Sequence, residues 1–235
     1  VLLEKKGKEL IIKPLKKISN REFLNDIKIY IRNTHGFYQH KIPEMKVMAE
    51  KIHDEHSLEE FYKVFNKLWH SGSNEDRSLA IHALELYNND FDLRTWKFLK
   101  NKLNDIKSID EAECIGKIIS FFYIKYSEFT NELLRLSQHK NIWVRRISLF
   151  CYYHILKNDI KDITIISVIE NNIHDKDRAM KMIITDILNK IGKLKEEALK
   201  RFILKNKDMP EDIFLAITGK MKYLRKIRGL KRLRG

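Results

Sequence analysis

Apolar residues recur along the chain with the spacing of amphipathic helices, and several apolar runs follow a residue that favours a helix start. Ser57 with Glu60 and Ser108 with Glu111 form two S-x-x-E capping boxes, each directly before such a run. Gly and Pro, which punctuate β-hairpins, number only eight and three in 235 residues. The pattern therefore predicts an all-α fold.

The predicted helices recur at a fixed interval. Helices that open a pair are expected near residues 57, 92, 127, 161 and 194, and their partners near residues 74, 108, 141, 176 and 210. Both series advance in steps of 33 to 35 residues, and two helices per step is the organisation of TPR, HEAT and armadillo arrays. The TPR signature residues are absent, whereas the segment N-I-W-V-R-R from Asn141 has the polar start and V-R pair typical of HEAT.

The array is expected to fill a single domain, 1–235, because no stretch shows the change in composition typical of a linker. We expect a helical N-terminal part at 1–56, five helix pairs at 57–219 and a basic C-terminal tail at 220–235. The N-terminal part is expected to contain helices at 20–32 and 43–53.

The net charge of +14 is concentrated at the two ends of the chain. Residues 221–235 contribute +7 and residues 1–18 contribute +4, so that only +3 is spread over the body. Such an excess favours a polyanion, above all nucleic acid, although a basic tail can also serve solubility alone. We therefore predict a right-handed α-solenoid of HEAT-like helix pairs with a concave, basic DNA-binding face.

The remaining composition bears on the compartment. Cys114 and Cys151 have no paired spacing, which favours free, buried thiols in a reducing compartment. The apolar runs are too short to cross a bilayer, and the chain shows no secretory-type start. We expect a cytoplasmic protein, associated with the nucleoid if the source is a prokaryote, with no membrane contact.

Equivalent positions on neighbouring second helices form columns on the concave face. Counting five residues from the caps Ser108 and Asn141 gives Glu113 and Arg146, which predicts a carboxylate and a guanidinium facing the same space. An ordinary salt bridge between repeats is the alternative reading of this pair. Arg145 occupies the V-R position of the repeat, so we assign it to packing.

Several segments resemble the AlkD-type DNA alkylation repair enzymes, which are HEAT-like glycosylases that release 3-methyladenine and 7-methylguanine. The segment from Leu68 is similar to the family's L-W-x5-E, and the segment from Asn141 is similar to its N-I-W-[LV]-x-R. The segment from Lys107, K-S-I-D-E-A-E, resembles K-S-W-W-D-S-V-D with one residue deleted. A weaker likeness over residues 37–46 keeps the family's proline as Pro43.

The resemblance implies roles for individual residues. Glu113 takes the place of the catalytic Asp, and the family's two tryptophan walls fall on Ile109 and on Thr185 or Asp186. The candidate lesion contacts are Ile109, Asp110 and Trp143. The candidate DNA-binding residues are Arg146, which takes the place of the family's DNA-contacting Arg, together with Lys140, Lys181, Arg225, Lys226, Arg228, Lys231 and Arg232.

We therefore expect a monomeric DNA glycosylase that hydrolyses the N-glycosidic bond of positively charged N3- or N7-alkylated purines in duplex DNA. It is expected to use neither a metal nor a cofactor, and the alkylated base, which already carries positive charge, is expected to leave without a general acid. One alternative is a HEAT-like protein that binds damaged or branched DNA without catalysis. A further alternative is a HEAT scaffold for a protein partner.

Overall fold

The computed structural model describes residues 42–157, 163–221 and 223–224. The described elements are all helices, which confirms the predicted all-α solenoid. The helix expected at 20–32 and the two basic ends at 1–18 and 225–235 lie outside the described residues.

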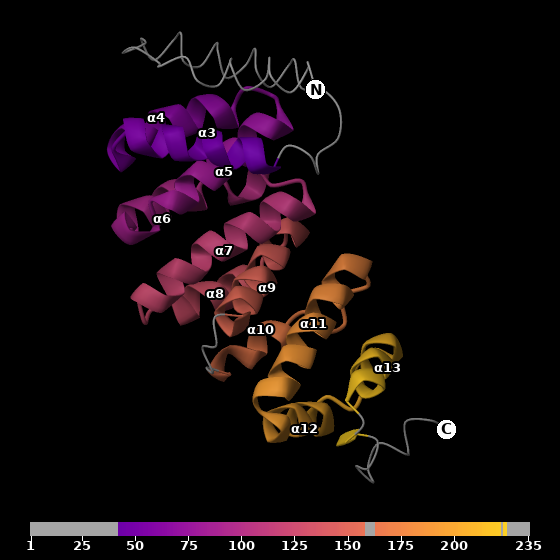
Figure 1. Cartoon of the computed structure of the whole chain (residues 1–235). Coiled ribbons are helices and arrows are strands. Elements are labelled where there is room, and N and C mark those ends of the chain that lie inside the picture. Colours follow the sequence, from indigo (N-terminus) through magenta and orange to yellow (C-terminus); the bar gives the residue numbers. More distant parts are fainter. Residues whose placement is uncertain (1–41, 158–162, 222, 225–235) are drawn as a thin grey trace, which may run out of the picture.

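The helices form two layers that stack from α3 and α4 at one end to α12 and α13 at the other (Figure 1). In the odd-numbered layer each helix packs against the next one in the series. The members of this layer are α3 (Ile42–Glu55), α5 (Asn74–Leu86), α7 (Ile109–Lys125), α9 (Ile142–Lys157), α11 (Arg178–Leu194) and α13 (Glu211–Lys220).

The even-numbered layer covers one side of this series, and its helices are shorter on average. In α4, the residues Phe61, Val64, Phe65, Leu68 and Trp69 are buried at helical spacing, so this helix presents one apolar face to the odd-numbered layer. The members of the even-numbered layer are α4 (Leu58–Trp69), α6 (Leu93–Lys100), α8 (Phe129–Ser137), α10 (Ser167–Glu170) and α12 (Glu196–Lys205).

Capping residues set where most helices begin. At α4 the Ser57 side chain accepts from the Glu60 backbone N–H while the Glu60 carboxylate accepts from the Ser57 N–H, so the predicted capping box is formed in full. At α7 the Ser108 Oγ accepts from the Glu111 N–H at 3.2 Å. The predicted starts near residues 57, 74, 92, 108, 127, 141, 176, 194 and 210 all lie within two residues of an observed start.

The helix predicted near residue 161 is the exception. Position 161 lies outside the described residues, and α10 begins only at Ser167 and has four residues. A 3-10 helix, η4 (Thr164–Ile166), precedes it, and Ile165 has non-helical dihedral angles. Thr and Ile lose side-chain rotamer freedom in an α-helix, so this run does not favour a long one.

Gly116 allows α7 and α9 to approach closely. A Cβ atom at this position would lie 2.5 Å from the Phe150 Cβ and 2.9 Å from the Cys151 backbone nitrogen. Such distances are too short for any side chain, so the contact depends on glycine. The close approach brings together the faces of α7 and α9 that carry the candidate site.

No helix in the described ranges is long and apolar enough to span a bilayer. Both cysteines are free thiols, Cys151 fully buried and Cys114 partly so. Burial raises the pKa of both.

Candidate functional groove

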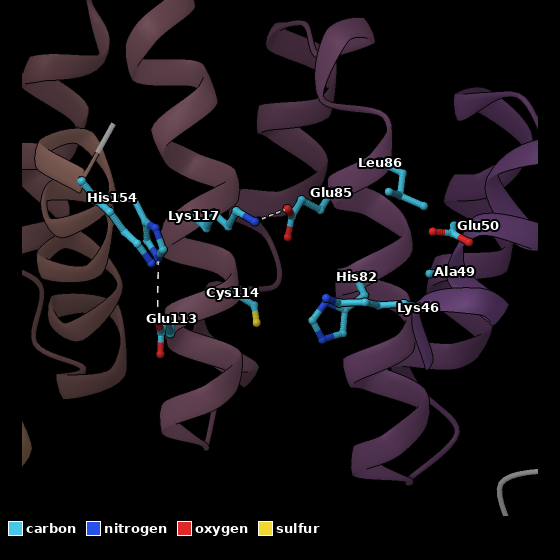
Figure 2. A pocket seen from close by; sticks show the side chains of 11 residues that line it. Lys46, Ala49, Glu50, His82, Glu85, Leu86, Glu113, Cys114, Lys117 and His154 are labelled. Carbon is cyan, nitrogen blue, oxygen red and sulfur yellow. Dashed lines mark hydrogen bonds and ion pairs between the residues drawn. The ribbon is translucent and has the colours of Figure 1, made fainter. Parts of the chain in front are cut away.

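An open groove of about 610 Å³ runs across four helices of the odd-numbered layer, from α3 to α9 (Figure 2). It contains Glu113, the residue that the sequence assigned to catalysis. The groove is lined by Lys46, Ala49, Glu50, His82, Glu85, Leu86, Glu113, Cys114, Lys117, His154 and Lys157.

The groove is balanced in charge, not basic. Its lining contains three lysines and three glutamates, and both of its histidines are neutral at pH 7 because burial lowers the pKa of each. In its middle, the Lys117 ammonium of α7 forms an ion pair with the Glu85 carboxylate of α5. Lys46 and Lys157 are exposed at its two ends, on α3 and α9. The positive excess therefore lies elsewhere, mostly at the termini.

Glu113 lies in this groove beside His154 of α9. The Glu113 side chain is 49% exposed, and its Oε1 is 3.9 Å from the Nε2 of His154, whose side chain is only 9% exposed. Burial, with Lys157 and Lys117 nearby, lowers the pKa of His154 to about 4. At neutral pH the pair therefore consists of a solvent-accessible carboxylate and a neutral imidazole.

Cys114 adjoins Glu113 in the groove. Burial, reinforced by nearby carboxylates including Glu85 and Glu113, raises the pKa of the thiol to about 12. A protonated thiol is a poor nucleophile. Covalent chemistry at Cys114 is therefore disfavoured at neutral pH.

The register of α7 refines the comparison with the alkylation-repair motif. In K-S-W-W-D-S-V-D the last Asp is the sixth residue after Ser, and the sixth residue after Ser108 is Cys114. Because α7 runs without interruption from Ile109 to Lys125, an ungapped match gives Cys114 that position. Glu113 precedes it by one residue, about 100° around the helix. Both side chains line the groove. The groove therefore contains a carboxylate, that of Glu113, one residue before the position of the motif's last Asp.

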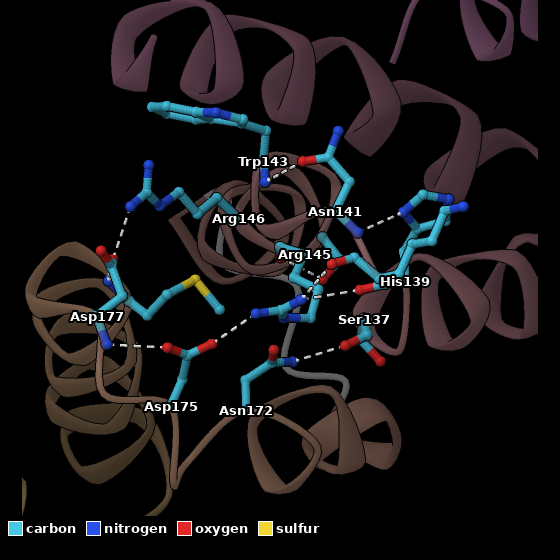
Figure 3. A network of polar contacts seen from close by, with 12 residues as sticks. Ser137, His139, Asn141, Trp143, Arg145, Arg146, Asn172, Asp175 and Asp177 are labelled. Atoms are coloured by element: carbon cyan, nitrogen blue, oxygen red, sulfur yellow. Dashed lines mark hydrogen bonds and ion pairs between the residues drawn. The ribbon is translucent and has the colours of Figure 1, made fainter. Parts of the chain in front are cut away.

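Arg146 does not face the same space as Glu113, contrary to the sequence prediction, because Glu113 lines the groove and Arg146 does not. Its Nη2 forms an ion pair with Asp177 at 2.7 Å, and its side chain is 9% exposed. The guanidinium also lies 4.1 Å from the centroid of the Trp143 ring (Figure 3). The expected column is broken because the cap of the next helix, Asp177, supplies a nearer carboxylate. A buried, paired guanidinium is poorly placed to hold a phosphate.

Arg145 joins two repeats, in agreement with its assignment to packing. Its Nη1 donates to the carbonyl of His139 at 2.9 Å and to that of Lys140 at 3.1 Å. Its Nη2 donates to Asp175 at 2.7 Å (Figure 3). These bonds tie the turn before α9 to the turn before α11.

The other predicted site residues are dispersed. Lys181 pairs with Asp212 at 2.7 Å, so its charge is already compensated. Lys140 is exposed in the turn before α9, and Ile109 and Asp110 are exposed in the first turn of α7. None of these lines the groove within the described part of the chain. Five predicted DNA-binding residues lie outside the described residues: Arg225, Lys226, Arg228, Lys231 and Arg232.

The positions of the family's tryptophan walls carry no aromatic residue. Ile109 is 38% exposed, Asp186 is exposed and Thr185 is half-buried. Trp143 is half-buried beneath Arg146. The described site therefore offers no pair of open aromatic faces at these positions.

Sequence reasoning missed His154, Lys117 and Glu85. Glu85 and Lys117 are separated by 32 residues, which is outside the 33-to-35-residue step, and they lie at different distances from the caps of α5 and α7, so the repeat carried no signal for their contact. His154 follows Lys117 by 37 residues, which is outside the 33-to-35-residue step. Its proximity to Glu113 depends on the close packing of α7 and α9 at Gly116.

Comparisons with known proteins agree with the fold and with the motif. A solved structure from Enterococcus faecalis, described as a predicted DNA alkylation repair enzyme, superposes with a TM-score of 0.65 at 13% identity. The match covers 88% of this chain and 99% of that chain, and at this identity it shows the fold. No curated protein matches the chain significantly. The family model for DNA alkylation repair enzymes matches residues 11–215, and the chain therefore belongs to the DNA alkylation repair enzyme family.

Proposed function

We propose that this protein is a DNA glycosylase that hydrolyses the N-glycosidic bond of purines made cationic by alkylation at N3 or N7. The observation that carries the proposal is the half-exposed Glu113 carboxylate in the groove of a chain that belongs to the alkylation repair family. The partner is duplex DNA that contains such bases.

The chemistry asked of this groove is modest. An N3- or N7-alkylated purine is already positively charged, so it departs without a general acid and water completes the reaction. As the bond breaks, the sugar develops oxocarbenium character, which a fixed carboxylate stabilises electrostatically. Glu113 can supply that charge because Lys117, an ammonium of the same helix and groove, is paired with Glu85.

DNA binding is expected to rely on cations outside the centre of the groove. Lys46 and Lys157 are exposed at its two ends, and the basic tail adds sequence-independent attraction for phosphates. This arrangement leaves the middle of the groove electrically balanced, so the negative charge of Glu113 is not masked.

The direct test is release of 7-methylguanine from methylated duplex DNA by the purified full chain under single-turnover conditions. We expect Glu113→Gln to abolish release while the dissociation constant for the duplex stays within about twofold, because the amide keeps the shape and removes the charge. Glu128→Gln is the matched control, since Glu128 is exposed at the start of α8. A wild-type protein that binds the duplex and frees no base contradicts the glycosylase proposal.

A second candidate function is supported by the lack of aromatic residues at Ile109 and at Thr185 or Asp186. A protein without those walls is suited to recognise distorted or branched DNA by shape and charge, with no catalysis. A protein of this kind should bind branched DNA more tightly than linear duplex. Glu113→Gln should change the affinity for neither DNA. The release assay separates this candidate from the first.

A further inference from the structure

The His154 imidazole has an unsatisfied hydrogen-bonding atom in the groove wall. Its Nε2 is buried and forms no hydrogen bond within the described ranges, although the ring lines the groove. An unpaired buried polar group destabilises the fold, because it has lost its hydrogen bonds to water, so such a group calls for a partner.

Glu113 is the group placed to become that partner. Its Oε1 lies 3.9 Å from the His154 Nε2, and an N–H···O bond requires about 2.9 Å. A shift of roughly 1 Å closes this gap, which a rotation of the half-exposed Glu113 side chain can supply. The ring is the less mobile partner because it is buried and α9 is held against α7 at Gly116.

A neutral donor suits the chemistry better than a charged one. A lysine or arginine at this place would orient the carboxylate and at the same time cancel the field that stabilises the sugar cation. The buried imidazole of His154 stays neutral, and the ammonium of Lys117 is paired with Glu85. Glu113 can therefore be held in place without losing its charge.

We infer that His154 is a positioning residue for Glu113, its Nε2–H holding the carboxylate toward the sugar in the groove. The inference rests on the proposed glycosylase function. The residue of α9 that takes part in the reaction is then His154, and not Arg146 as the sequence predicted.

The kinetic test compares His154→Leu, which removes the donor, with His154→Gln, which keeps one. In single-turnover release of 7-methylguanine we expect His154→Leu to slow the rate by roughly tenfold to a hundredfold, the scale of a misplacement of about 1 Å. The dissociation constant for the duplex is expected to stay the same, and His154→Gln is expected to recover most of the rate. His174→Leu, in an exposed turn far along the chain, serves as the control.

Two further measurements distinguish positioning from a general loss of structure. In a Glu113→Asp background, His154→Leu should cost much less than in the wild type if His154 acts through Glu113. By ¹⁵N NMR of the full chain, the neutral His154 should carry its proton on Nε2, and Glu113→Gln should lower its pKa further by removing a nearby negative charge.

The outcomes separate the inference from the function on which it rests. An active wild type whose His154→Leu variant is equally fast, or whose His154→Gln variant is no better than His154→Leu, overturns the inference and leaves the glycosylase standing. A His154 proton on Nδ1, or a His154 pKa that Glu113→Gln leaves unchanged, also overturns the inference. Neither measurement uses His154→Leu, so both remain valid if that variant folds poorly. An inactive wild type overturns the glycosylase, and the role of His154 in it.

Discussion

Two adjacent arginines show how tertiary contacts sort side chains that are alike in the sequence. Arg145 binds two backbone carbonyls and Asp175, while Arg146 stacks on Trp143 and pairs with Asp177. Both therefore join neighbouring repeats. At the residue scale, the groove depends instead on Glu113, His154 and their neighbours.

Replacing Arg146 tests whether it is structural. We expect Arg146→Met to lower the free energy of unfolding by about 2 kcal/mol, because Asp177 loses its partner and Trp143 loses its cation. The salt dependence of duplex binding should not change. Urea denaturation and binding titrations provide these values, with the exposed Arg135→Met as the control. A shallower salt slope at unchanged stability would identify Arg146 as a phosphate contact instead.

The buried His154 also predicts a pH dependence of stability. The pKa of His154 is about 4 in the folded chain and 6.5 for the free side chain. Between pH 6.5 and pH 4, His154 is therefore protonated in the unfolded chain and neutral in the folded chain. Stability is thus lost as the pH falls from about 6.5 to about 4, by up to about 3 kcal/mol from this group. Urea midpoints across this interval should fall less steeply in His154→Leu. Equal slopes in the two proteins contradict the buried, neutral state of His154.

At the scale of elements, the contact between α7 and α9 decides whether the groove exists in its present form. Gly116 sets the distance between these helices, and Glu113, Cys114 and Lys117 near it on α7 line the groove. The Ser108 cap fixes where α7 begins, and hence which of its residues face α9. The capping box predicted there is only half formed, because the Glu111 carboxylate binds Arg77 and the Lys107 N–H.

A methyl group at Gly116 should therefore disturb both stability and activity. We expect Gly116→Ala to lower the free energy of unfolding by about 1 to 2 kcal/mol, since the clash with Phe150 and Cys151 outweighs the higher helix propensity of Ala. Release of 7-methylguanine should slow as Glu113 and His154 separate. Gly219→Ala is the matched control, because a Cβ atom there meets nothing within 4 Å, and it should be neutral or stabilising. Equal stability of the two variants would rule out a glycine-dependent contact.

At the scale of the whole molecule, charge and chemistry are separated along the chain. The groove is balanced, whereas residues 225–235 carry six Lys or Arg and no acid. Met221 and Leu224 are buried in the core, so a truncation that keeps both of these core residues begins at Arg225.

Removing residues 225–235 should weaken duplex binding mainly at low salt. Each phosphate contact contributes about 0.9 to the slope of log K against log salt, so up to six contacts can be lost. We expect a flatter slope by several units and an unchanged single-turnover rate at saturating protein. Replacing the six cations with Gln is the control for chain length. If the slope is unaffected by either change, the tail serves solubility alone.

The sequence by itself determined the helices and their pairing. Capping residues and apolar spacing are local signals, which is why most helix starts were predicted within two residues and the family was recognisable at the segments from Leu68 and Asn141. The run before Ser167 was the exception, since its β-branched residues are poor formers of a long helix.

Only the tertiary structure decided which side chains meet. Counting from the caps placed Glu113 and Arg146 in one column. A shared column predicts the helix face on which a side chain lies, but it does not predict which side chain it contacts. Asp177 is nearer to Arg146, and Gly116 brings His154 to Glu113 across 41 residues of sequence. Side-chain contacts depend on the distance and rotation between packed helices, which the close approach of two backbones sets and a one-dimensional pattern does not encode.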